Sequence, residues 1–249
     1  EIEFRDFAGV GVAFKLACAL YDGDVEDLLE DYADYVTIGT IGDMVPLLNE
    51  NRAIVKAGLK LINTDAKIGI SALKKSTNSK AEHFSATDVA FQICPRINAA
   101  GRMDTANLSV DLLTCEDNEI AEYKAEQLNL ENTHRHEVEE KIDKDIAEIM
   151  ANDRAYQTDR VIVVAGHNYH KGVIGICAAH LVELYSKPAI VIGIDDEGNA
   201  TGSARSIDGF NIFEAISSCS DILTHFGAHP LAAGMGLNVK DIAAFRKRI

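Results

Sequence analysis

The chain has 249 residues, of which 47% are hydrophobic and 25% are charged, so it can form the core of one large or two modest domains. Its net charge of −15 argues against a protein that binds nucleic acid through overall positive charge, although a local cationic groove or bound divalent ions could supply the attraction. No run of about 18 apolar residues is present, so we expect no transmembrane helix.

The first residues, Glu1 to Asp6, are charged and include neither an initiator methionine nor the apolar segment of a signal peptide. We therefore expect a fragment that starts within a longer protein. The five cysteines are scattered without a CxxC pair, which is typical of buried thiols in a reducing cytoplasm. Residues 8–20 open with Gly-x-Gly and predict a helix, but the third glycine of a dinucleotide-binding fingerprint does not follow.

Residues 26–32 predict a short acidic helix, and the β-branched run at 35–41 predicts a strand. Asp43 follows this expected strand almost directly. Open α/β sheets bind their ligands at strand ends, so Asp43 is either a metal ligand or a cap of the following turn.

Helices are predicted at residues 51–62, 68–74 and 86–93. The segment that follows, 94–103, is expected to be a turn that carries Arg96 and Arg102 among small residues. Arginines in such a setting suit the recognition of phosphate or carboxylate groups, and a solvated loop is the alternative.

Residues 117–150 are almost free of Gly and Pro, and apolar residues recur there at helical spacing. We expect one long helix, or a kinked pair, that connects two lobes. His134 and His136 within it are two positions apart and do not share a helix face, which argues against a metal pair.

The second lobe is expected to be a mixed sheet with the order β-α-β-β-α-β. The predicted strands are 160–165, 189–194 and 200–206, with a last strand at 235–239. Helices are predicted at 173–185, 212–219 and 221–225. Residues 226–234, which contain Gly227, His229 and Gly234, read as a glycine turn between a helix and a strand, or as a helix start that favours an anion.

Six segments of the chain, in order, resemble the RecJ family of the DHH phosphoesterase superfamily. They are residues 8–16, 39–47, 95–103, 169–176, 202–207 and 227–234. Each motif is short, but together they cover nearly the whole chain. The resemblance implies an α/β fold of two lobes joined by a long helix. Residues 1–115 would be the C-terminal part of a DHH phosphoesterase domain, 116–152 the connecting helix, and 153–249 a DHH-associated nucleic-acid-binding domain with a mixed sheet.

The resemblance also implies a function, namely 5′→3′ exonuclease activity on single-stranded DNA in recombination and repair. It implies two Mn²⁺ or Mg²⁺ ions, with Asp43 as a catalytic metal ligand and His229 facing the scissile phosphate. Arg102 would contact the end of the strand, and Ser203 and Arg205 would bind the 5′-phosphate. Gly227 belongs to the Gly-Gly-His motif of the family, in which the second glycine is Ala228 here.

The family's Asp-x-Asp and Asp-His-His motifs, which supply most of the metal ligands, precede the segment that matches residues 8–16, and residues 1–7 contain neither of them. A dinuclear site needs several fixed ligands, so we predict that this chain alone binds no active-site metal and has no nuclease activity. Two alternatives stay open. One is a nanoRNase or cyclic-dinucleotide phosphodiesterase of the same superfamily, and the other is a catalytically inactive replication scaffold.

The resemblance further implies a cytoplasmic protein that meets single-stranded DNA with a 5′ end and no membrane. A single-strand-binding protein or a helicase would be a further partner.

Overall fold

The computed structural model describes residues 4–249, and the chain divides into two compact units between Thr133 and His134. This division lies inside one long helix, α8 (Asn118–Asn152), which confirms the expected helix at 117–150. Among the described residues, no helix combines the length and the apolar character that crossing a bilayer requires.

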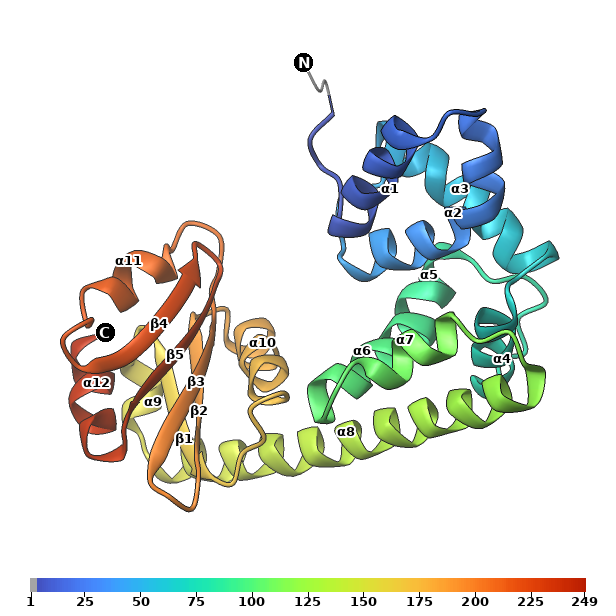
Figure 1. Ribbon diagram of the computed structural model, residues 1–249. Helices are drawn as coiled ribbons and strands as arrows, with labels where there is room; N and C mark the ends of the chain where they lie inside the picture. The colour runs from blue at the N-terminus through green and yellow to red at the C-terminus, as the bar shows by residue number, and fades with distance from the viewer. Residues whose placement is uncertain (1–3) are drawn as a thin grey trace. The chain divides into compact units, whose positions relative to one another are not determined.

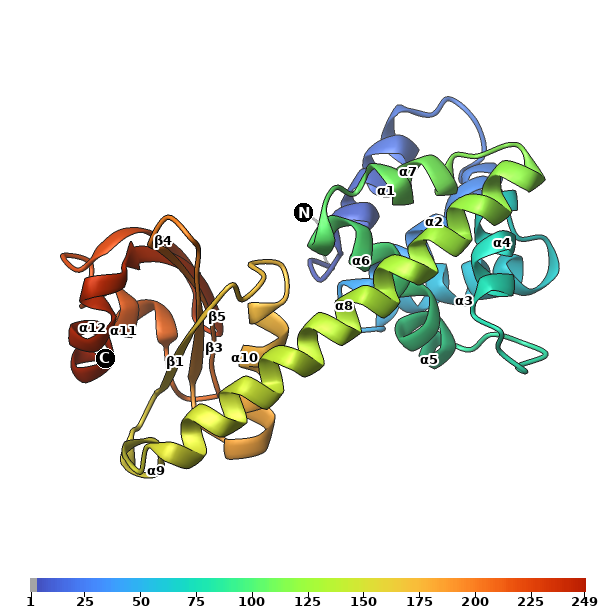
Figure 2. The same cartoon turned by 90° about the horizontal axis from the view of Figure 1, so that it is seen from below.

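The first unit contains only helices among its described residues (Figures 1 and 2). They are α1 (Gly9–Leu20), α2 (Val25–Gly42), α3 (Asn49–Thr64), α4 (Ile68–Ser76), α5 (Ala86–Asp88), a π turn (Val89–Ile93), α6 (Cys94–Met103), α7 (Asn107–Leu113) and the first part of α8. The predicted helices at 51–62, 68–74 and 86–93 are confirmed. Their apolar faces meet in one core that also receives Ala121, Ala125 and Leu128 from α8.

The strand expected at residues 35–41 is wrong, because this run is the second half of α2. Ile38 and Ile41 point into the helical core, and α3 packs closely against the same helix through Gly58. The helix propensity of a β-branched residue is lower than that of Ala by under about 1 kcal/mol. Burial of large aliphatic side chains outweighs that cost.

The turn expected at residues 94–103 is also wrong, because these residues form α6. Pro95 occupies the first turn of this helix, where its missing N–H group breaks no hydrogen bond. Ala99 and Ala100 are buried, so the small residues that suggested a loop form a close-packed helix face instead.

The second unit is built on a five-stranded mixed sheet with the order β1-β2-β3-β5-β4. The strands are β1 (Ile162–His167), β2 (Ala189–Ile194), β3 (Asn199–Arg205), β4 (Leu223–His229) and β5 (Ala232–Asn238). Strands β1 and β2 are parallel, and the other pairs are antiparallel. The described helical segments of this unit, besides the second part of α8, are α9 (Ala155–Thr158), α10 (Ile174–Tyr185), α11 (Ile212–Ser217), a 3₁₀ turn (Val239–Asp241) and α12 (Ile242–Arg248).

The helices of this unit cover different faces of the sheet. Helix α10 connects β1 to β2 and lies on one face, whereas α11 and α12 lie on the other (Figure 1). Ala204, Ala233 and Met235 face α11 and α12 and form the second core together with Ile216 and Phe245. The predicted mixed sheet is confirmed, with one strand more than expected.

That additional strand, β4, replaces the helix predicted at 221–225, and the glycine turn predicted at 226–234 is the end of β4, a two-residue turn and the start of β5. Strands β4 and β5 form a hairpin that reverses at Pro230 and Leu231. Phe226 and Ala228 are half-buried against the core, whereas Gly227 and His229 are exposed, which is the period of a strand that faces solvent on one side. A register shift between Leu223 and His225 interrupts this alternation.

Candidate functional site

Four of the residues singled out in the sequence lie on one face of the sheet in the second unit. Ser203 in β3 is opposite Gly234 in β5, and Gly234 is opposite Gly227 in β4. Residues directly opposite each other in an antiparallel ladder point to the same side. Ser203, Gly234 and Gly227 therefore form one row across three strands.

A second row runs parallel to the first, and each of its residues lies two positions away from a residue of the first row on the same strand. Arg205 is opposite Ala232, which is opposite His229. Because residues two apart in a strand share a face, this second row lies on the same side as Ser203. The predicted phosphate-binding residues and the predicted histidine thus belong to one surface, although Ser203 and His229 are 26 positions apart in the chain.

The first turn of α10 lies directly over Ser203 and Arg205. A side chain at Gly175 would place its Cβ 2.9 Å from Ser203 Oγ and 3.1 Å from Arg205 Nη2, so a glycine here permits the close approach of the helix. The Arg205 Nη1 group donates hydrogen bonds to Ser203 Oγ at 3.2 Å and to the Ala204 carbonyl at 2.8 Å. A helix N-terminus, a guanidinium group and a hydroxyl group together favour an anion.

Beyond α10 the same face is open. No atom lies within 4 Å of a Cβ built on Gly227 or on Gly234, so a ligand can reach the strand backbone there. His229 is exposed at the end of β4. The open glycine backbone therefore lies directly beside the polar side chains of Ser203, Arg205 and His229.

Sequence reasoning missed His225 on this face. It lies two positions before Gly227 in β4, is exposed, and its ring lies against Gly236 of β5. The period-two series 225, 227 and 229 could have identified it, but only if the segment had been recognised as a strand.

The other two predicted residues belong to the first unit. Asp43 is the C-cap of α2 and is exposed, so its placement after a strand is wrong. Its backbone N–H donates to the Gly39 carbonyl at 3.0 Å. Arg102 is exposed in the last turn of α6.

Asp43 lines a pocket of about 240 Å³, together with residues of α2 and α6 that include Cys94 and Asn98. Burial raises the pKa of the Cys94 thiol to about 11, and this thiol donates to the Ile38 carbonyl. Besides this buried thiol, the pocket offers one carboxylate and one amide, which is too few fixed ligands for the two ions that the resemblance implies.

The raised pKa of Cys94 makes a prediction about its reactivity. At pH 8 only about one Cys94 side chain in a thousand is a thiolate, because the pKa lies about three units above that pH. We expect iodoacetamide to label the half-buried Cys18 and Cys115 at pH 8 well before Cys94. Mass spectrometry of tryptic peptides over time measures the three rates, and labelling of Cys94 as fast as Cys18 would contradict the expectation.

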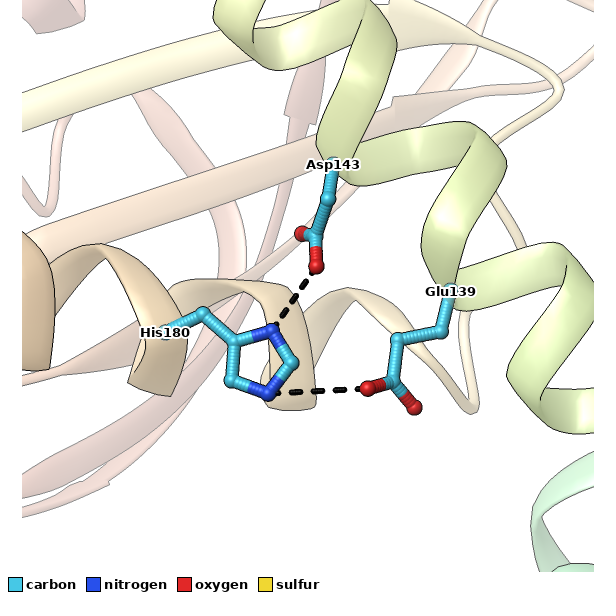
Figure 3. A group of neighbouring side chains, drawn as sticks. All are labelled: Glu139, Asp143 and His180. Atoms are coloured by element: carbon cyan, nitrogen blue, oxygen red, sulfur yellow. Dashed lines mark hydrogen bonds and ion pairs between the residues drawn. The ribbon is translucent and has the colours of Figure 1, made fainter.

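Only one group of three potential metal-ligating side chains lies close together among residues 4–249. Glu139 and Asp143 of α8 face His180 of α10, as Figure 3 shows. His180 Nδ1 is 2.8 Å from Asp143 Oδ2, and His180 Nε2 is 3.5 Å from Glu139 Oε1. None of these three residues was singled out in the sequence.

Comparison with known proteins supports a relationship along the whole chain. Residues 158–249 match the DHHA1 domain family. The chain is 44% identical over 247 residues to the single-stranded-DNA-specific exonuclease RecJ of Bacillus subtilis, and the match covers 99% of this chain and 31% of that protein. The RecJ of Haemophilus influenzae is 32% identical over 258 residues, which cover 97% of this chain and 45% of that protein.

Solved structures give the same result. RecJ from Thermus thermophilus in complex with Mn²⁺ superimposes with a TM-score of 0.86 at 32% identity, over 100% of this chain and 36% of that one. A manganese-bound exonuclease RecJ superimposes with a TM-score of 0.81 over 99% of this chain and 61% of that one. The chain thus spans about a third to three fifths of the relatives it matches, and its two-unit α/β architecture agrees with theirs.

Proposed function

We propose that this chain is a part of a RecJ-type exonuclease, a metal-dependent enzyme that removes nucleotides from the 5′ end of single-stranded DNA. The observation that carries the proposal is the alignment of Ser203, Arg205, Gly227 and His229 on one sheet face. The similarity to RecJ over nearly the whole chain supports it.

In this proposal the sheet face of the second unit holds the 5′ end of the strand. The Arg205 guanidinium and the Ser203 hydroxyl donate hydrogen bonds to the terminal phosphate, next to the first turn of α10. The following sugar and phosphate lie over Gly227 and Gly234, where no side chain blocks the strand backbone. His229 donates to a phosphate oxygen from the far end of the neighbouring row, the row that contains Arg205.

Asp43 is proposed as one metal ligand of the longer protein, and Arg102 as a contact to the end of the strand. Because the residues around Asp43 do not make a dinuclear site, we expect this chain alone to bind DNA ends without cleaving them. The remaining metal ligands would belong to parts of the relatives that lie outside the aligned segment.

The test uses the 249-residue chain and fluorescence anisotropy. We expect it to bind a 5′-phosphorylated single strand at least about tenfold more tightly than the same strand with a 5′-hydroxyl, and more tightly than a blunt duplex. Added Mn²⁺ should cause no degradation of any of them. Equal affinity for the two 5′ ends would contradict the proposed phosphate site. Tighter binding of dinucleotides than of longer strands would favour a nanoRNase instead.

A further inference from the structure

We propose that Glu139, Asp143 and His180 form a binding site for one zinc-like transition-metal ion that links α8 to α10. All three residues belong to the second unit, and one ligand atom from each can be chosen so that all lie within 4.8 Å of one another (Figure 3). The proposal concerns this chain alone and does not depend on the proposed exonuclease function.

The spacing of the donors fits a small cation. An ion bound at about 2.0–2.2 Å by nitrogen and oxygen ligands in a tetrahedral arrangement keeps those ligands about 3.3 Å apart. Here Asp143 Oδ2 lies 2.8 Å from His180 Nδ1, and Glu139 Oε1 lies 3.5 Å from His180 Nε2, so the two carboxylates contact different nitrogens of the ring. An ion binds one of these nitrogens, and the carboxylate that contacts the other nitrogen has to turn toward the ion. One ligand atom from each of the three side chains already lies within 4.8 Å of the others.

The carboxylates are arranged one helical turn apart, at positions i and i+4 of α8. Like charges at this spacing repel each other. A divalent ion shared between them removes the repulsion and replaces a proton on the imidazole nitrogen that binds it. One imidazole and two carboxylates suit Zn²⁺, Ni²⁺ or Co²⁺ better than Mg²⁺, which prefers oxygen ligands only.

The Glu139 carboxylate is already held in place by a hydrogen bond on the side away from His180. Arg135 Nη1 donates to Glu139 Oε2 at 2.6 Å, which leaves Oε1 directed toward His180. The Glu139 side chain is only 12% exposed, whereas those of Asp143 and His180 are 36% and 43% exposed. The site is therefore ordered on its inner side and open to ions and water on its outer side.

The group contains three protein ligands and no fourth. Cys177 lies one turn before His180 on α10, and burial, together with the nearby Asp143 carboxylate, raises the pKa of its thiol. Cys177 does not belong to the group of side chains whose ligand atoms lie within 4.8 Å of one another. Three protein ligands leave at least one position for water, so we expect a weaker site than a four-ligand structural zinc centre.

The experiment is a calorimetric titration of the chain with ZnCl₂ after treatment with EDTA and gel filtration. We expect one Zn²⁺ per chain, and at least tenfold weaker binding in His180→Ala and in Asp143→Asn. His83→Ala and Asp22→Asn serve as matched controls, because His83 and Asp22 are exposed and lie in the first unit. Both controls should bind Zn²⁺ as the unchanged chain does.

Two further measurements keep the outcome clear if a variant is poorly folded. Circular dichroism in EDTA checks that each variant keeps its helices and sheet. Saturating Zn²⁺ should raise the thermal midpoint of the unchanged chain by a few degrees, and it should not do so in His180→Ala. Absence of one-to-one binding, or equal loss in the control variants, would overturn the proposal and leave His180 as an ion-pair partner of the two carboxylates.

Discussion

Arg205→Ala should lower the affinity of the chain for a 5′-phosphorylated single strand by about 10- to 100-fold. A hydrogen bond to a charged group contributes about 1.5–3 kcal/mol, and the guanidinium can donate two of them to one phosphate. Affinity for the matching 5′-hydroxyl strand should change by less than about threefold, because that strand lacks the terminal anion. Fluorescence anisotropy with both strands at fixed salt measures the difference.

Two further variants distinguish specific recognition of the 5′-phosphate by Arg205 from a general effect of positive charge on DNA affinity. Arg205→Lys keeps the positive charge but loses the planar fork, so its affinity should fall between those of the unchanged chain and Arg205→Ala. Arg160→Ala removes the same charge from an exposed position that precedes β1. If Arg160→Ala weakens binding as much as Arg205→Ala does, the effect is general electrostatics and the phosphate site at Arg205 is wrong.

Gly58→Ala should reduce the free energy of unfolding of the first unit by about 3 kcal/mol or more. A Cβ at this position would overlap the Ala33 carbonyl oxygen and the Thr37 hydroxyl of α2. The carbonyl is part of the helix backbone and cannot rotate away, so α2 and α3 would have to separate. Urea unfolding followed by circular dichroism measures the loss.

Gly101→Ala is the matched control, because it makes the same substitution in another helix of the same unit. Its new Cβ would meet Ala106 Cβ at 3.5 Å, which is ordinary van der Waals contact. We therefore expect Gly101→Ala to leave stability unchanged or to raise it by up to about 1 kcal/mol, since Ala is the better helix former. Equal destabilisation by the two variants would show that close packing at Gly58 is not the cause.

Long or strongly periodic segments could be predicted from the sequence. The apolar stripe between residues 138 and 149 predicted α8, and the continuous aliphatic run at 189–194 predicted β2 with its observed bounds. Such patterns are local, because a helix face or a buried strand is visible in consecutive residues. Each short motif was also visible in consecutive residues, and the order of the motifs along the chain indicated the resemblance.

Short segments with conflicting signals could not be predicted. Residues 35–41 have strand propensity but form a helix, because burial against α3 outweighs propensity. Residues 223–229 looked like a helix followed by a turn, and they pair with β5 over their whole length. In both cases the deciding partner is distant in sequence, so no window around the segment contains the information.

The candidate site divides in the same way. The chain order alone supplied the residue types at Ser203, Arg205, Gly227 and His229 and the chemistry they suit. Only the antiparallel pairing of β3, β5 and β4 decided that these side chains share one face, and only the approach of α10 decided that Glu139 and Asp143 meet His180. Residue identity is a local property of the sequence. The register of the strands and the contact between α8 and α10 are not local, because both depend on burying the two faces of the sheet at the same time.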